Sequence, residues 1–166
     1  MGTRSFSAVR RLVQLAGLLL ALPMVTPLTG STEETVKIVS SLPRTGSSNG
    51  QTTSMVNGIR MALEEANFKA GPLTVQYEDW DDASPARGAW DPALEAQNAE
   101  RAVKDPAVVA YIGPYNSGAA KISMPKLNEA SILQVNPSAT AAGLTKAGLG
   151  EPNEPTVYRP SGTINF

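Results

Sequence analysis

The sequence predicts an α/β fold, in which a doubly wound, mainly parallel sheet is flanked by helices. Short apolar runs typical of strands alternate along the chain with segments of helical spacing. The run Ala107–Ile112 is rich in Val and closed by Gly113-Pro114, as expected for a strand buried on both faces. A second run, Ile132–Val135, follows a segment of helical composition, Ser117–Ala130. This order indicates a right-handed βαβ crossover between parallel strands.

Residues 1–30 are predicted to be a signal peptide. Three arginines precede the apolar run Leu12–Met24, which is too short to span a bilayer. Small residues follow at Thr29-Gly30-Ser31, where we place the cleavage. A retained membrane anchor is the alternative interpretation. The chain has no cysteine, which excludes a disulfide framework and a lipid-anchored terminus.

The charge of the remaining residues, 31–166, argues against nucleic acid as a partner. Three of the 14 basic residues and none of the 15 acidic ones lie in residues 1–30, which leaves 11 basic against 15 acidic residues. A net charge of about −4 provides no basic stripe to contact phosphates. The chain also has no histidine, the commonest general base and metal ligand.

The first predicted strand is Val36–Leu42, which has a polar break at Lys37 and two serines near its end. A turn-rich loop, Pro43–Gly50, follows it. Residues 51–67 are predicted to form a helix, because their apolar residues recur at helical spacing. These residues form one stripe that we expect to be buried: Met55, Val56, Ile59, Ala62, Leu63 and Ala66. Gly71-Pro72 stops the segment.

The second predicted strand, Leu73–Tyr77, alternates apolar and polar residues, which indicates a half-buried strand near an edge of the sheet. No element is predicted for Ala83–Trp90. Asp91-Pro92 is a typical helix start, with Asp as the cap and Pro at the first position. The helix is predicted to run to about Lys104.

After Thr140 the sequence predicts a short helical piece, Ala141–Lys146, and one more short strand, Val157–Arg159. No helix follows that could cover the last strand before Phe166. We therefore expect residues 31–166 to be the amino-terminal lobe of a longer, bilobed ligand-binding domain, with the second lobe absent.

Two polar turns follow the strands of the central crossover. Residues 114–118 follow the first strand and residues 136–140 follow the second, and both turns carry hydroxyl groups and small residues. Ligands of parallel α/β sheets bind outside the carboxyl ends of the strands. The candidate ligand-binding residues are those in the two turns: Asn116, Ser117, Gly118, Ser138, Ala139 and Thr140.

Several motifs resemble those of type I periplasmic binding proteins. IVSSLPRTGSSNGQ, YIGPYNSG, PKLNEASILQVNPSAT and VYRPSG occur in the order and spacing of that group. Within it, the chain resembles the branched-chain amino acid (Leu/Ile/Val) substrate-binding proteins of ABC transporters. The resemblance covers Val36 to about Phe166 and is strongest over Tyr111–Thr140. Residues 83–90 look like an additional loop.

The resemblance implies a bilobed receptor that holds an amino acid on its amino-terminal lobe and then closes over it. Ser117 matches the family serine whose hydroxyl, with neighbouring amides, binds the ligand carboxylate. Ser138 falls where a backbone carbonyl receives the ligand ammonium, although the family often has a small apolar residue there. Thr140 matches a threonine whose hydroxyl and amide touch the ligand.

The physical chemistry of Ser117 agrees with this role. At the start of a helix, unpaired amides and the positive end of the dipole favour a carboxylate, and a hydroxyl donates without adding charge. The alternative is that Ser117 is only a helix cap and that residues 138–140 form an ordinary turn. Arg44, Asn49 and Gln51 are further candidates for lining the cleft, whereas Trp80 and Trp90 fit packing or rim positions.

Enzymatic and metal sites are weakly supported. Ser123 and Lys126 fit S-x-x-K but lack the accompanying motifs, and a Ser-His-Asp triad is impossible without histidine. The acidic group Glu78, Asp79, Asp81 and Asp82 matches no EF-hand and is interpreted as a solvated strand end rather than a calcium site. The glycines of Pro43–Gly50 are too sparse for a phosphate loop. No enzyme activity, cofactor or metal is predicted.

The predicted function is therefore that of a periplasmic or extracellular solute-binding protein. It would capture a small amino acid and deliver it to a membrane-embedded ABC permease, acting as a monomer when full length. The alternative is the ligand-sensing extracellular domain of a membrane receptor with the same fold. A third hypothesis, an α/β hydrolase, has less support, because the sequence shows no strained turn that would carry a nucleophilic serine. The sequence does not fix which amino acid binds.

Overall fold

The computed structural model describes residues 34–144 and 163–165, with the side chains of 34–144. Within these residues the main sheet has the strand order β2-β3-β1-β6-β7-β8. The central strand β1 (Thr35–Leu42) pairs in parallel with β3 (Leu73–Asp81) and with β6 (Val108–Ile112). The outer strands are β7 (Leu133–Asn136) and β8 (Thr163–Asn165), both parallel to their neighbours, and the antiparallel β2 (Lys69–Ala70).

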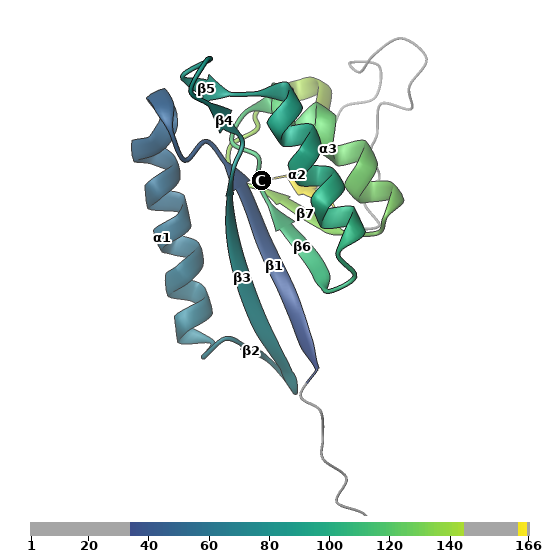
Figure 1. The fold of residues 1–166 in the computed structure, drawn as a ribbon. Coiled ribbons are helices and arrows are strands. Elements are labelled where there is room, and N and C mark those ends of the chain that lie inside the picture. The colour runs from purple at the N-terminus through teal and green to yellow at the C-terminus, as the bar shows by residue number, and fades with distance from the viewer. Residues whose placement is uncertain (1–33, 145–162, 166) are drawn as a thin grey trace, which may run out of the picture. The chain divides into compact units, whose positions relative to one another are not determined.

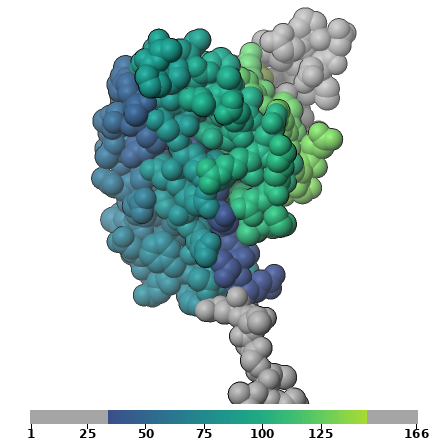
Figure 2. All heavy atoms as spheres, in the orientation of Figure 1, coloured from purple at the N-terminus to yellow at the C-terminus, as the bar shows by residue number. Residues whose placement is uncertain are grey.

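Three helices connect the parallel strands and cover both faces of the sheet. Helix α1 (Asn49–Glu65) lies on one face, and α2 (Pro92–Lys104) and α3 (Ser117–Glu129) lie side by side on the other (Figure 1). In the space-filling view, β1 shows only as a narrow purple strip low in the picture (Figure 2). The alternation of strands and helices confirms the predicted doubly wound α/β fold.

The helix boundaries follow local chemistry. Asp91 caps α2 by accepting a hydrogen bond from the amide of Ala93 at 2.8 Å, and Pro92 occupies the first position, as predicted. Helix α1 begins and ends two residues earlier than expected. It ends at Glu65 because Asn67 and Phe68 take positive φ angles of 53° and 51°, which no α-helix accommodates.

The hydrophobic core lies between the sheet and the pair α2 and α3. Trp80 of β3 and Tyr111 of β6 meet edge to face, with ring centroids 6.4 Å apart. Leu127 of α3 is fully buried beside them. The rest of this cluster comes from the strands, from α2 and from the residue before β7: Val39, Ala102, Val108 and Ile132.

The predicted stripe on α1 is less buried than expected. Only Thr52 and Val56 are buried on this helix, and Ala62 and Ala66 are exposed. Strand β3 has only the two-residue strand β2 on its outer side, which agrees with a position near the edge. It also extends to Asp81, four residues beyond the predicted end.

Residues 83–90, for which no element was predicted, form a small hairpin of β4 (Ala83–Ser84) and β5 (Ala89–Trp90). The hairpin is anchored to the short helix η1 (Gly46–Ser48), because the amide of Ser47 donates to the carbonyl of Gly88 at 3.0 Å. A Cβ atom at Gly46 would collide with that carbonyl. The loop after β1 and the hairpin are thus held together at the carboxyl edge of the sheet.

The end of the chain differs in part from the expectation. The short helix η2 (Ala142–Leu144) falls within the predicted helical piece, and β8 was not predicted. The predicted strand at 157–159 and the predicted signal peptide lie outside the described residues. Among the helices in the part of the chain that is described, none is long and apolar enough to cross a membrane.

Candidate functional site

The two predicted turns meet at one edge of the sheet. Strands β6 and β7 are parallel neighbours, with Ile112 opposite Val135. Their carboxyl ends therefore release both turns on the same side. The first turn begins with a cis peptide bond between Gly113 and Pro114. The second begins at Asn136, the last residue of β7.

Two hydrogen bonds join the turns directly. The hydroxyl of Ser138 donates to the carbonyl of Tyr115 at 2.6 Å, and the amide of Ala141 donates to the hydroxyl oxygen of Ser117 at 3.1 Å. Because the oxygen of Ser117 is the acceptor in this bond, its own hydrogen can be donated to another group. The turns thus form one surface, and Ser117 retains a donor at it.

The start of α3 adds backbone donors to this surface. Asn116 occupies the N-cap position but its side chain makes no capping hydrogen bond, and Ser117 and Gly118 begin the helix. The first amides of a helix have no partner within the helix and carry the positive end of its dipole. Gly118 is exposed and Ser117 is half-buried. This arrangement can accept a carboxylate group.

The second turn is held from within by Asn136. Its side-chain oxygen accepts hydrogen bonds from the amides of Ser138 at 3.1 Å and Ala139 at 2.6 Å. The side chain of Ala139 is 6% exposed and packs against Ala120, so this residue has its carbonyl oxygen left for a ligand. Thr140 is exposed. The turn therefore offers the Thr140 hydroxyl and backbone carbonyls.

Two buried amide atoms beside the turns have no hydrogen-bond partner within residues 34–144. These atoms are the side-chain oxygen of Asn116 and the side-chain nitrogen of Asn136. Buried polar groups are normally paired, so each is a position where water or a ligand group would be stabilised. Both residues lie at the carboxyl ends of the strands that carry the candidate site.

Trp90, expected at a packing or rim position, lies against the candidate site, but its contact with Gly118 was not predicted. A Cβ atom at Gly118 would lie only 2.8 Å from the indole atom Cζ2 of Trp90. The hairpin thus brings an aromatic ring to the first turn of α3. The sequence shows only that Trp90 directly precedes the helix cap Asp91. The position of its ring depends on how the hairpin folds, which the sequence does not indicate.

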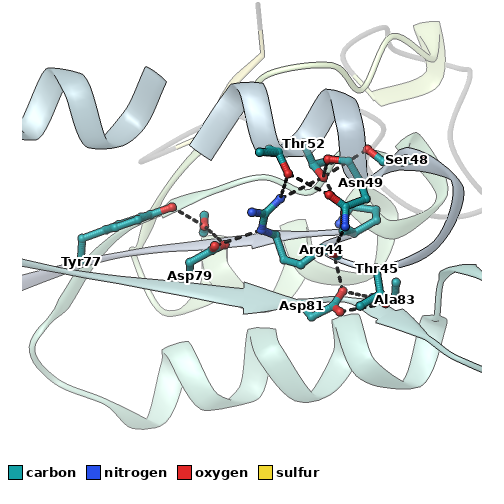
Figure 3. Close-up of polar contacts among 12 residues, drawn as sticks. Arg44, Thr45, Ser48, Asn49, Thr52, Tyr77, Asp79, Asp81 and Ala83 are labelled. Carbon is teal, nitrogen blue, oxygen red and sulfur yellow. Dashed lines mark hydrogen bonds and ion pairs between the residues drawn. The ribbon is translucent and has the colours of Figure 1, made fainter. Parts of the chain in front are cut away.

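Arg44, a candidate for lining the cleft, is already paired. Its Nε atom donates to Asp79 at 2.9 Å, and its Nη1 atom reaches the hydroxyl groups of Thr52 at 3.2 Å and Thr53 at 3.3 Å (Figure 3). Asn49 donates its side-chain amide to the Arg44 carbonyl at 2.7 Å. These contacts fix the loop after β1 to α1 and β3, and they account for the arginine without a ligand.

Comparisons with known proteins show the family of the chain. A family model described as periplasmic binding protein matches residues 35–164. The chain belongs to the periplasmic binding protein family. Comparison with curated proteins gives no match.

Several solved structures of binding proteins resemble the chain. The branched-chain amino acid transporter substrate-binding protein LivJ of Streptococcus pneumoniae, in complex with isoleucine, is 26% identical, with a TM-score of 0.58 over 67% of this chain and 31% of LivJ. The leucine-binding protein LivK of Thermotoga maritima is 27% identical, with a TM-score of 0.56 over 64% of this chain and 28% of LivK.

A solute-binding protein of an ABC transporter from R. palustris, in complex with benzoate, shares the fold at 18% identity. Its TM-score is 0.63, over 79% of this chain and 32% of that one. The chain therefore spans about a third of the length of the structures it matches. LivJ and the R. palustris protein are named as binding proteins of transporters, and LivK is named as a leucine-binding protein.

The acidic residues of this periplasmic binding protein are not the solvated strand end that was expected. Glu78 pairs with Lys37 at 2.7 Å and Arg101 at 2.6 Å, and Asp79 pairs with Arg44. Asp82 is fully buried. The interpretation was wrong because β3 continues through these residues and places them against other elements. In the described ranges, no group of three or more acidic side chains is placed to hold a metal ion.

Ser123 and Lys126, the S-x-x-K pair, point to different surroundings. Ser123 is fully buried and accepts a hydrogen bond from Gln134, whereas Lys126 forms an ion pair with Glu100 at 2.6 Å. A shallow hollow of about 370 Å³ lies beside that ion pair, between the carboxyl-terminal halves of α2 and α3. It is at the opposite end of the helices from the candidate site.

Proposed function

We propose that this chain captures a small amino acid, branched-chain or similar, for uptake by an ABC importer. The proposal rests above all on the two turns at the carboxyl ends of β6 and β7, which hydrogen bonds join into one surface. It is supported by the family and by the similarity to LivJ and LivK, which are named as binding proteins for branched-chain amino acids. In this proposal residues 1–30 are a signal peptide and residues 31–166 are the amino-terminal lobe.

The ligand carboxylate would lie at the start of α3. The hydroxyl of Ser117 and the first amides of the helix would donate to it, with Asn116 and Gly118 on either side. The exposed hydroxyl of Thr140 would add a donor from the second turn. A charge-free set of donors suits a zwitterion, because the ammonium group then meets no nearby cation.

The ligand ammonium would lie toward the second turn, where carbonyl groups are available. The Ser138 hydroxyl is occupied by the Tyr115 carbonyl, so its part in binding would come from its backbone. Ala139 would likewise contribute its carbonyl, because its amide bonds Asn136. The ring of Trp90 would border the site beside Gly118.

Alanine variants test the assignment of the donors. In a full-length protein with both lobes, Ser117→Ala and Thr140→Ala should each weaken binding of leucine by about 1–3 kcal/mol, the range for a hydrogen bond to a charged group. Ser54→Ala is a matched control, since Ser54 is exposed on α1 and bonds its own helix at Gly50. Calorimetric titration with leucine, isoleucine and valine is the measurement. Unchanged affinity in both site variants would overturn the assignment.

A further inference from the structure

Glu95 is an acid in the centre of the core. Its side chain lies on α2 and is 0% exposed. Its two oxygens accept hydrogen bonds from the hydroxyl of Ser41 in β1 at 2.6 Å and from the hydroxyl of Tyr111 in β6 at 3.1 Å. One buried carboxyl group therefore links a helix to the two central strands of the sheet.

Polar side chains lead from Glu95 toward the candidate site. The hydroxyl of Ser123 in α3 lies near the Glu95 carboxyl group and lowers its pKa. The side-chain amide of Gln134 in β7 donates to the Ser123 hydroxyl at 3.1 Å and to the carbonyl of Gly113 at 2.9 Å. Gly113 is the residue where β6 passes into the first turn. Glu95 is thus two side chains away from the start of that turn.

A second path is steric. Gly113 has a φ angle of 126°, and a Cβ atom there would collide with the carbonyl oxygen of Ser41. Ser41 in turn donates to Glu95 and accepts from the side chain of Asn98 at 2.9 Å. Gly113 and the carbonyl group of Ser41 are in close contact, and closely packed groups do not move independently. Displacement of Ser41 would therefore displace the turn that begins at Gly113.

Among residues 34–144, no lysine or arginine is buried that could balance the charge of Glu95. Asp82, after β3, is also 0% exposed, and neither of its oxygens has a hydrogen-bond partner within residues 34–144. Of the elements around Glu95, β6 presents Tyr111 and the end of β3 presents Asp82, whereas β1 and α3 present the serines 41 and 123. A buried acid beside a second buried acid is more stable in its neutral form.

The pKa values follow from this surrounding. Burial raises the pKa of Glu95 to about 8, the hydroxyl of Ser41 lowers it in part, and the charge of Asp82 raises it further. Burial raises the pKa of Asp82 to about 7, with Asp81 adding to the shift. Both values lie above the ordinary carboxyl range. The neutral form of the pair therefore stabilises the fold fully below the ordinary carboxyl pKa, and this stabilisation is lost progressively as the pH rises to 7 to 8.

We propose that Glu95 is a positioning residue: in its neutral form it holds the turn at 113–118 and the start of α3 in place, and its ionisation displaces them. Asp82 tunes this ionisation by acting on the same buried site. The consequence for ligand capture rests on the proposed function, whereas the displacement of the turn does not require a ligand. Binding would be strongest at or below neutral pH and would weaken above it.

The test is a pH titration of the whole chain by amide NMR between pH 5.5 and 8.5, without ligand. The amides of residues 113–118 should shift with an apparent midpoint between about 7 and 8. Glu95→Gln keeps a neutral donor and acceptor in place and should abolish this titration without unfolding the chain. Asp82→Asn should lower its midpoint. Glu100→Gln is the control, because Glu100 is an exposed residue of the same helix, and it should titrate like the unchanged chain.

The outcomes separate the proposal from a purely structural role. If Glu95 only packs, the turn amides stay constant over this range in every variant, and the proposal is overturned. It is equally overturned if Glu95→Gln still titrates like the unchanged chain. Denaturant unfolding over the same range gives a second readout. Below about pH 7, each pH unit should change the unfolding constant by up to a hundredfold in the unchanged chain, where two acids have raised pKa values, and by up to tenfold in Glu95→Gln.

Leucine titrations at pH 6 and pH 8.5 then address the ligand. The unchanged chain should lose affinity at the higher pH, and Glu95→Gln should keep it. If leucine binds neither protein at either pH, the proposed function fails, while the titration of the turn amides still decides the role of Glu95. A turn that titrates with no change in leucine affinity would contradict the link between the two.

Discussion

The two faces of the sheet are stabilised in different ways. On the face of α2 and α3, the helices bury eight of their residues against Trp80, Tyr111 and other core side chains. On the face of α1, only Thr52 and Val56 are buried on the helix, and Met61 is 60% exposed. Each face has a cation over an aromatic ring, Arg60 at 5.2 Å from Tyr77 and Arg101 at 4.1 Å from Trp80, so the difference between the faces lies in apolar burial.

The difference shows which parts of the lobe can vary at little cost. The candidate site is carried by α3 and by the turns on the tightly packed face. Apolar burial therefore fixes the side of the sheet on which the candidate ligand-binding groups lie. On the other face, the network around Arg44 attaches the beginning of α1 to the carboxyl end of β3 (Figure 3).

The largest expected contrast is between core truncations on the two faces. Leu127→Ala, on α3, should reduce the free energy of unfolding by about 2–5 kcal/mol, because a fully buried side chain leaves a cavity. Met61→Ala, on α1, should change it by no more than about 0.5 kcal/mol. Denaturant unfolding of both variants is the measurement. Similar losses would show that the faces are equally packed.

A smaller contrast is expected between charged residues. Arg44→Ala should cost about 1–3 kcal/mol, because Asp79 loses its partner in a partly buried position and two threonine hydroxyls lose a donor. Lys126→Ala, on the surface of α3, should cost about 0–1 kcal/mol, since its pair with Glu100 is exposed. Unfolding measured at low and high salt checks both values. A larger loss of stability in Lys126→Ala than in Arg44→Ala would contradict the expectation that the Arg44–Asp79 pair contributes more than the exposed Lys126–Glu100 pair.

The smallest contrast concerns two glycines in helices. Gly58→Ala, on α1, should stabilise the chain by about 0.5–1 kcal/mol, since nothing lies within 4 Å of the added methyl group. Gly118→Ala should gain nothing or destabilise, because its methyl group would meet the Trp90 ring. Thermal unfolding measures the stability, and tryptophan fluorescence should change only in Gly118→Ala. An equal gain in both variants would show that Trp90 does not pack there.

Much of the fold could be predicted because its signals are local. The cap Asp91 and Pro92 define the start of α2 by themselves, and Gly113-Pro114 closes β6. The hairpin at residues 83–90 could not be predicted, since each of its strands has two residues and its anchor is a contact between Gly46 and Gly88. Those two glycines are 42 residues apart, so no local pattern records the contact.

The candidate site was predicted in outline and not in its surroundings. The turns could be located because parallel strands release them at one edge, and Ser117 begins α3 as expected. The burial of Asp82 and Glu95 could not be foreseen, because acidic residues are almost never fully buried and the sequence gives no sign of the enclosing hydroxyl groups. The contact of Trp90 with Gly118 depends on the hairpin for the same reason.

The central claim is that the joined turns at the carboxyl edge of β6 and β7 bind a small amino acid. Titration of the isotope-labelled chain with leucine, followed by amide NMR, tests it most directly. We predict shifts concentrated at residues 116–118 and 138–140, with weak binding, roughly millimolar or about 4 kcal/mol, because one lobe offers an open surface. Shifts centred instead on the hollow beside Glu100 and Lys126, or none at millimolar leucine, would contradict the claim.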